Sequence, residues 1–219
     1  RGPSEHRLIS NEKGVAVVDA LEPGAYTAHV DDPAYLIAVA DLDIVARRQT
    51  TVQLRVLAKP SRPAVVVTKK EIALRRQISF ATGSDEILPN SEPILLEVAD
   101  VLLRNPNLEL VEIQGHTDNS GDRQLNMRLS QRNLELVEIQ GHTDNSGDRQ
   151  LNMRLSQRRA EAVQRWLVQH GVESIRLMAK GYGPTRPVVP NITQQNRARN
   201  RRVQFRIVRR ADVAAAAAR

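Results

Sequence analysis

Short apolar runs separated by turn residues fill positions 14–57. The runs GVAVVDAL, AYTAHV, AYLIAVADLDIV and TTVQLRVL are interrupted by Glu-Pro-Gly and Asp-Asp-Pro, which are common turn sequences. β-Branched residues are frequent in these runs, as expected for strands. The pattern predicts a small all-β domain over residues 1–58, arranged as an antiparallel sheet or a sandwich.

The pattern changes over residues 59–70, where prolines and basic residues precede an apolar run. This composition is typical of a linker that then enters a strand. We therefore expect a second domain over residues 71–210. The alanine-rich tail, residues 211–219, is assigned no function.

Strand and helix patterns alternate in the second domain. Strands are expected over 72–80, 175–182 and 203–208, the last because Val203, Phe205 and Ile207 alternate with polar residues. A first helix is expected to follow the segment 89–93, and a second to run over 149–170, with Gly171 as its left-handed C-cap. The apolar positions of these helices are Ile94, Leu95, Val98, Val101 and Leu102 in the first, and Leu151, Leu155, Ala162, Val163, Trp166 and Leu167 in the second. The order predicts an α+β fold.

One segment of the second domain occurs twice. Residues 107–132 are followed by an identical copy, residues 133–158. Each copy has an apolar run, Gly-His-Thr-Asp, a polar turn, and leucines at helical spacing, which predicts strand, loop and helix start. Two undiverged copies do not resemble a solenoid, so we interpret them as a tandem duplication inside one domain. We expect the second copy to occupy the sheet, because it keeps the loop contiguous with its helix.

The loop of the second copy can form a binding site. Asp144 stands where the strand ends, and Arg159 projects from the inward-facing side of the following helix. A carboxylate suits an ammonium group and a guanidinium suits a carboxylate, so the pair suits a zwitterion. The amides of Asn145 to Gly147 and the helix N-terminus add donors for an anionic group. The alternative is a salt bridge between Asp144 and Arg159 that only ties the loop to the helix.

The second domain resembles the OmpA C-terminal-like family, the peptidoglycan-anchoring domain of outer-membrane porins, peptidoglycan-associated lipoproteins and flagellar stator subunits. The resemblance spans about residues 71–209. It rests on five motifs: Ile78-Ser-Phe with Ile87-Leu-Pro; Gly141-His-Thr-Asp-Asn-Ser-Gly; Leu151-Asn-x-x-Leu-Ser-x-x-Arg-Ala; Gly181-Tyr-Gly; and Asn200-Arg-Arg-Val.

The resemblance implies a βαβαββ fold, with helices on a mixed sheet, that binds the diaminopimelate of the wall's stem peptide. It implies that Asp144 holds the amine and Arg159 the carboxylate. Asn152 and a C-terminal arginine, Arg201 or Arg202, would support them. Thr143, Asn145 and Gly147 complete the set of candidate peptidoglycan-binding residues.

The sequence departs from the family pattern in the first copy and near the first strand. Asn133 stands where the family has its arginine, so Asp118, the duplicate-copy candidate, has no arginine at the required spacing within its own copy. Ala81 stands where many relatives have an acidic residue. We therefore expect the first copy alone not to form a site.

Composition excludes several function classes. The chain has 219 residues, ordinary hydrophobic (41%) and charged (26%) fractions, and no cysteine, which excludes thiol catalysis and disulfides. It has no Gly-x-Ser-x-Gly elbow, no apolar run long enough to span a membrane, and no signal-peptide pattern at its start, so any export signal would lie upstream. The net charge of +7 favours an anionic partner.

We therefore expect a non-enzymatic peptidoglycan-binding protein without a cofactor, in the periplasm and associated with the outer membrane or cell wall. Homo-oligomers or strand exchange through the duplication are possible arrangements. The alternative is an envelope interaction or metal-binding domain without wall affinity. A metal would need both copies to meet, through His116, Asp118, His142 and Asp144. Nucleic acid is not expected as the partner of the arginines in 197–210, because the chain has few aromatic residues.

Overall fold

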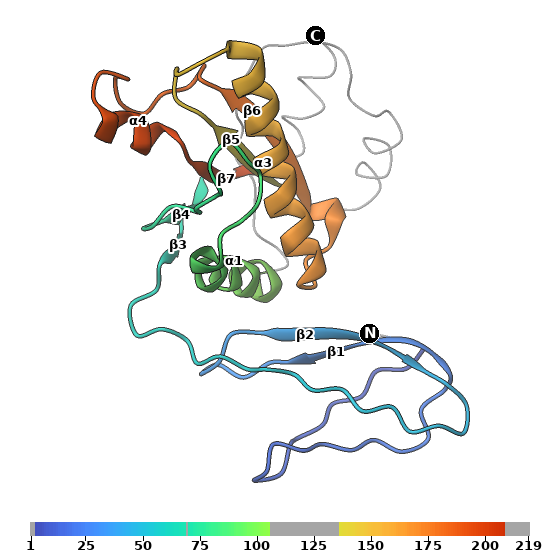
Figure 1. Ribbon diagram of the computed structural model, residues 1–219. Helices are drawn as coiled ribbons and strands as arrows, with labels where there is room; N and C mark the ends of the chain where they lie inside the picture. The colour runs from blue at the N-terminus through green and yellow to red at the C-terminus, as the bar shows by residue number, and fades with distance from the viewer. Residues whose placement is uncertain (1–2, 69, 106–135, 209–219) are drawn as a thin grey trace. The chain divides into compact units, whose positions relative to one another are not determined.

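A computed structural model describes residues 3–68, 70–105 and 136–208. The chain divides into two compact units, residues 1–59 and 60–219 (Figure 1). The first copy of the duplicated segment, including Asp118 and Asn133, lies outside the described residues. The two units are described separately below.

The first unit contains a two-stranded antiparallel sheet. Strand β1 (Gly24–Val30) pairs with β2 (Ala38–Ile44), and a single bridge joins Tyr35 to Ala58. Its described core is small, because only Tyr26 and Leu36 are buried apolar side chains there. The apolar runs at 15–18 and 51–57 form no strand, so of the two predicted arrangements the described residues of this unit show the antiparallel sheet and not the sandwich.

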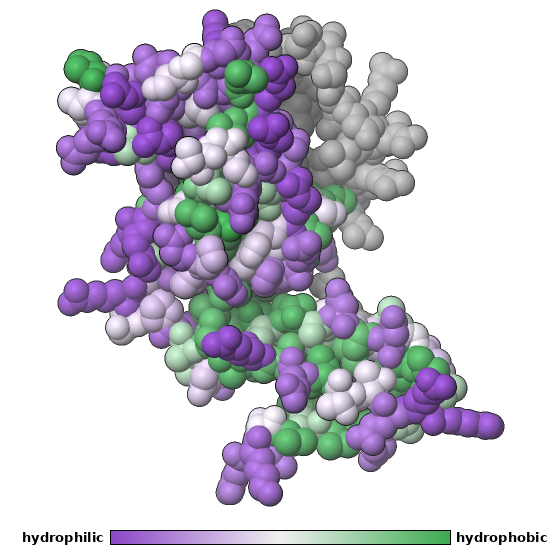
Figure 2. Space-filling view, viewed as in Figure 1, coloured by the Kyte–Doolittle hydropathy of each residue, from purple (hydrophilic) through white to green (hydrophobic). Residues whose placement is uncertain are grey.

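The exposure of the run at 15–18 explains why it forms no strand. Val15 is 51% exposed and Val17 is 72% exposed, so this run has no packing surface to bury it. β-Propensity depends on such packing more than on the backbone. Green apolar residues accordingly appear on the surface of the first unit in Figure 2.

The second unit is a mixed sheet packed against helices. Its five strands lie in the order β3-β4-β7-β5-β6, with β5 and β6 parallel and the other pairs antiparallel. The strands are β3 (Val65–Val67), β4 (Glu71–Leu74), β5 (Leu136–His142), β6 (Leu177–Gly183) and β7 (Val203–Val208). The helices are α1 (Glu92–Arg104), α3 (Arg149–Gln169) and α4 (Gln194–Asn200), with 3-10 turns at Pro89–Ser91 and Ser174–Arg176.

This architecture confirms the predicted α+β fold. The sequence copy in the sheet is the second, since β5 lies within residues 133–158, as predicted. The helix over Arg149–Gln169 and the strand over Val203–Val208 are also confirmed. Gly171 has φ 89°, in agreement with the predicted left-handed cap.

Two boundaries and one helix position differ from the prediction. Strand β3 lies inside the predicted linker 59–70, and the carboxylate of Glu97 on α1 explains why: its Oε2 accepts hydrogen bonds from the amides of Ala64 and Val65 at 2.7 and 3.2 Å. The strand expected over 72–80 ends at Leu74, and Phe80 keeps only a bridge to Ile87. Leu151 is 58% exposed and lies outside the buried stripe of α3.

Helix α3 rests directly on the backbone of the sheet. A Cβ on Gly141 would lie 2.0 Å from the Ser156 carbonyl oxygen, and one on Gly181 would lie 2.4 Å from the Gln157 nitrogen. The Ser156 hydroxyl accepts the Gly183 amide at 2.9 Å, and Gln157 Oε1 accepts the Gly181 amide at 2.7 Å. The glycines and these polar contacts fix α3 against β5 and β6 at backbone distance.

Candidate functional site

The candidate site begins at the buried end of β5. His142, Thr143 and Asp144 are buried in succession, whereas the residues from Asn145 to Asp148 are exposed. Asp148 caps α3, since its carboxylate accepts the Leu151 amide at 2.8 Å. The site therefore lies between a buried strand end and the first turns of α3.

Asp144 is an ionised, largely buried carboxylate. Its Oδ2 pairs with Nη1 of Arg201 at 2.5 Å, and its Oδ1 accepts the Ser146 amide at 2.9 Å. Burial alone would raise the pKa of Asp144, but the hydrogen bonds from Ser146 and Arg201 outweigh it and hold that pKa below its ordinary value. Asp144 thus presents a negative charge at neutral pH.

Arg159 reaches the same region from α3. Its Nε donates to the carbonyl oxygen of Ser84 at 2.9 Å, and its guanidinium carbon lies 4.9 Å from the centre of the Phe80 ring. Burial and then the charge of Arg201 lower the pKa of Arg159, while Asp85 and Asp144 partly offset this shift. The inward-facing cation predicted from the sequence therefore finds its partners in a carbonyl and an aromatic ring.

Asp144 and Arg159 do not form an ion pair with each other in the described part of the chain, where Asp144 pairs with Arg201 instead. The alternative of a salt bridge that ties the loop to α3 through these two residues is therefore wrong. Within the described residues, the hydrogen bonds of Arg159 use only its Nε. Its two terminal nitrogens make no hydrogen bond to those residues. We call Asp144, Arg159 and Arg201 the Asp144 site.

Four predicted residues shape the loop rather than carry its charge. Asn152 donates from Nδ2 to the Ser146 carbonyl at 2.7 Å, which holds the loop above α3. Gly147 has φ 80°, a left-handed conformation that favours glycine. Asn145 is exposed, and Thr143 is buried with its amide donating to the Gly183 carbonyl at 3.0 Å.

The two candidate C-terminal arginines are separated by the structure. Arg201 contacts Asp144, whereas Arg202 donates from Nη2 to Gln204 Oε1 at 2.9 Å and to the Arg186 carbonyl at 3.2 Å. Successive residues next to a strand point to opposite sides, so one arginine faces the site and the next turns away. Arg201 is therefore the supporting arginine of the Asp144 site.

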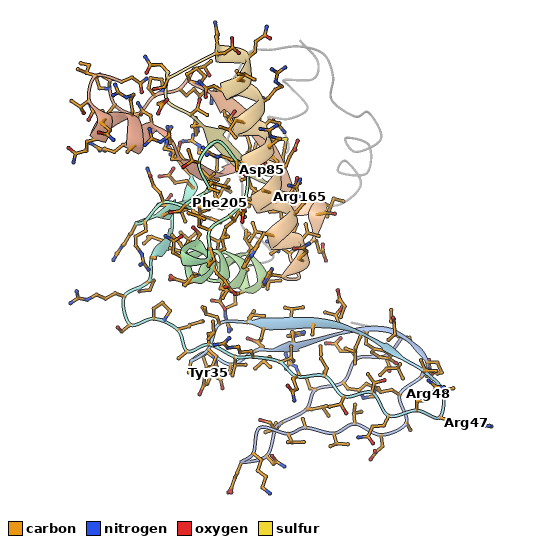
Figure 3. The ribbon with its side chains drawn as sticks, viewed as in Figure 1. Tyr35, Arg47, Arg48, Asp85, Arg165 and Phe205 are labelled. Atoms are coloured by element: carbon orange, nitrogen blue, oxygen red, sulfur yellow. The ribbon has the colours of Figure 1, made fainter. Side chains whose placement is uncertain are left out.

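Sequence reasoning missed the loop that positions Arg159. The Ser84 carbonyl binds Arg159, and the neighbouring Asp85 lies 3.8 Å from Arg158 and 3.6 Å from Arg165 on α3 (Figure 3). Asp85 is acidic and α3 is rich in arginine, and this opposite charge was the signal in the sequence that could have indicated the contact. The backbone contact of Ser84 leaves no signal in the sequence, because any residue has a carbonyl.

We expect Asp85→Asn to change stability by less than about 1 kcal/mol, because both of its arginine partners are more than half exposed. The variant should weaken ligand binding at the Asp144 site by no more than about fivefold, through a looser Ser84 loop. Thermal unfolding and calorimetric titration of the same preparation measure both effects. A loss of binding as large as that of an Arg159 variant would show that Asp85 itself contacts the ligand.

The described residues contain neither a metal-type cluster of His, Cys, Asp and Glu nor a helix long and apolar enough to cross a membrane. His142, one of the ligands in the metal alternative, is buried and stacks on Tyr182 with ring centres 5.4 Å apart. Burial, with the charges of Arg202 and Arg186, lowers the pKa of His142 to about 3. His116 and Asp118 lie outside the described residues.

Residues 79–133 and 131–201 each match the OmpA family, so the match spans more than half of the chain and is made once for each copy. The chain belongs to the OmpA family. This membership confirms the resemblance of the second domain to that family. It also agrees with the prediction of a non-enzymatic protein.

Relatives of this OmpA-family chain include envelope proteins. Outer membrane porin F of Pseudomonas fluorescens is 48% identical over 142 residues, which cover 65% of this chain and 34% of the porin. The probable lipoprotein YiaD of Escherichia coli is 42% identical over 128 residues, which cover 58% of this chain and 46% of the lipoprotein. The chain thus spans between a third and a half of the length of these relatives.

Among solved structures, the peptidoglycan-associated lipoprotein from Burkholderia pseudomallei aligns with a TM-score of 0.43 and 24% identity, covering 60% of this chain and 86% of that one. The periplasmic domain of Helicobacter pylori MotB aligns with a TM-score of 0.48 and 18% identity, covering 69% of this chain and 91% of that one.

Proposed function

We propose that this OmpA-family chain binds peptidoglycan non-covalently through the diaminopimelate of the stem peptide. The observation that carries the proposal is the Asp144 site: a buried, ionised carboxylate paired with Arg201, with Arg159 near enough for its pKa to respond to both charges. A free amino-acid centre has an ammonium and a carboxylate on the same carbon. A site with adjacent negative and positive groups matches both charges at once.

The roles of the three side chains follow from their contacts. The Asp144 carboxylate accepts the ligand's ammonium, since its Oδ1 and Oδ2 each have a further lone pair beyond the contacts with Ser146 and Arg201. Arg159 binds the ligand carboxylate with its terminal nitrogens, while the Ser84 carbonyl holds its Nε. Arg201 pairs with Asp144, and its side chain is 44% exposed. It therefore contacts the ligand carboxylate from the solvent side.

We further propose that wall binding anchors an outer-membrane or other envelope complex in the periplasm. The family and the names of the relatives, a porin and a lipoprotein of the outer membrane among them, support this assignment. One stem-peptide contact has modest affinity, but a wall polymer offers many of them. An oligomer or a membrane-tethered chain would therefore be retained through multivalency.

We expect Arg159→Ala to weaken binding of free diaminopimelate and of isolated sacculi by about tenfold to a hundredfold, because a charge-assisted contact contributes about 1.5 to 3 kcal/mol. The matched control is Arg158→Ala, the preceding residue on α3, whose side chain is 56% exposed. Calorimetry with diaminopimelate and sacculus sedimentation measure the two affinities.

Equal sacculus binding by folded Arg159→Ala and by Arg158→Ala would remove the assigned role of Arg159. If the chain binds sacculi and free diaminopimelate does not displace it, another component of the wall is the ligand. Absence of wall binding by the unmodified chain would favour the alternative of an envelope interaction domain without wall affinity.

A further inference from the structure

The sheet of the second unit has a second, polar face. Val137, Ile139 and Gly141 of β5 face the helices, so Glu138, Gln140 and His142 point to the opposite side. The register brings Glu138 beside Arg206 and Gln140 beside Gln204, both on β7. We call this side, with Tyr182 from β6 and Arg202 next to β7, the polar sheet face.

Several residues of this face have buried polar atoms without partners. Glu138, Gln140 and His142 are each at most 3% exposed. Among the described residues, Gln140 Nε2, both ring nitrogens of His142, and the Nε atoms of Arg202 and Arg206 are buried without a hydrogen-bond partner. Leaving several such groups unsatisfied in one place is costly, so each cluster of them calls for an explanation.

The unpartnered atoms are mostly donors. An arginine Nε and an amide nitrogen only donate, and a neutral imidazole donates from one of its two nitrogens. His142 is neutral at physiological pH, since burial and two nearby arginines lower its pKa to about 3. The group that completes this cluster must therefore be an acceptor with several oxygen atoms.

The charges around the cluster have the matching sign. The guanidinium carbon of Arg186 lies 4.1 Å from the centre of the Tyr182 ring. Lys180, which is on β6 like Tyr182, has its Nζ 5.6 Å from the same ring centre. Together with Arg202 and Arg206, these cations outnumber the carboxylates of Glu138 and Glu71 among the described residues of this face. Glu138 is already engaged, because it accepts the Tyr182 hydroxyl at 2.6 Å.

We propose that the polar sheet face contains a second binding site, distinct from the Asp144 site, that takes a phosphate-type oxyanion on Gln140, His142, Arg202 and Arg206. The unpartnered Nε groups of Arg202 and Arg206 can each donate a charge-assisted hydrogen bond to a phosphate oxygen. Inorganic phosphate and the phosphate of a lipid headgroup share this chemistry. The site lies on the side of the sheet turned away from α3, so both sites can be occupied together.

The direct test titrates inorganic phosphate into the whole chain at constant ionic strength and follows the Nε–H signals of Arg202 and Arg206 by NMR. We expect saturable shifts of both signals. Arg206→Gln and Gln140→Leu should each weaken phosphate binding by about tenfold, and the second keeps the side-chain volume while it removes the amide. The matched control, Arg199→Gln, changes an exposed arginine on α4 and should leave the affinity unchanged.

A second arm distinguishes the source of the phosphate. Vesicles of phosphatidylglycerol that bind the chain in competition with inorganic phosphate would identify a lipid headgroup, whereas binding of inorganic phosphate alone would identify a free anion. Shifts that do not saturate, or equal affinity in all three variants, would overturn the proposal. Arg159→Ala should bind phosphate normally, so loss of wall binding and loss of phosphate binding can be told apart.

Discussion

Asp144→Ala is expected to lower the affinity for diaminopimelate by about a hundredfold, while Asp118→Ala leaves it nearly unchanged. The two residues are equivalent in the duplicated sequence, but Asp144 belongs to the copy that forms β5 and α3. In the described structure Asp144 has Arg201 within an ion-pair distance and Ser146 as a hydrogen-bond donor. Asp118 is its internal control, because the same residue change is made in the same sequence context.

Calorimetric titration of both variants with free diaminopimelate measures this difference. Asp144→Asn is a companion variant that keeps the side-chain shape and removes the charge, so it separates loss of charge from loss of packing. Equal partial losses in Asp144→Ala and Asp118→Ala would show that the copies exchange places in the sheet. A larger loss in Asp118→Ala would contradict the assignment of the second copy.

Gly141→Ala is expected to destabilise the second unit by about 3 kcal/mol or more, at the upper end of the cost of overpacking. The added Cβ would meet the Ser156 carbonyl at 2.0 Å, and the obstacle is helix backbone that no side-chain rotation can relieve. Chemical denaturation followed by far-ultraviolet circular dichroism measures the loss. Gly115→Ala, the same change in the first copy, should alter stability by less than about 0.5 kcal/mol.

The pair of glycine variants also tests exchange of the copies. A small loss in Gly141→Ala together with a large loss in the Gly115→Ala/Gly141→Ala double variant would mean that the first copy replaces the second when the second cannot pack. Equal losses in the two single variants would contradict the prediction directly.

The elements predicted correctly from sequence were those in which the apolar residues that recur at a regular spacing are also the ones that the fold buries. Val203, Phe205 and Ile207 alternate in the sequence and are all buried in β7. In contrast, α4 was missed, because its sequence QQNRARN has no apolar period. Its fold depends on Thr193, whose hydroxyl caps it, and on Asn200, whose buried amide binds Val188, Val189 and Asn191. Such polar networks depend on residues that meet only after folding.

The sequence predicted which charged residues lie at the candidate site, but not which residues each of them contacts. Asp144 and Arg159 were found from their spacing, and Arg201 was found only together with Arg202. The choice between these two arginines depends on which side of β7 each one leaves, and one residue of register decides it. The Ser84 carbonyl and the Phe80 ring that hold Arg159 come from a loop distant in sequence, so no local pattern could have indicated them.

Helix α3 contacts β5 and β6 at backbone distance. This packing fixes the separation between Asp144, at the end of β5, and Arg159, on α3. Extra residues within 145–148 would disturb contacts of the site, because the Ser146 amide donates to Asp144 and the Asp148 carboxylate caps α3. One extra residue between Gln157, which contacts the sheet, and Arg159 would turn Arg159 by about 100° around the helix axis. The direction from which the guanidinium approaches the ligand is therefore set by Gly141 and Gly181, which let α3 pack on the backbone of the sheet.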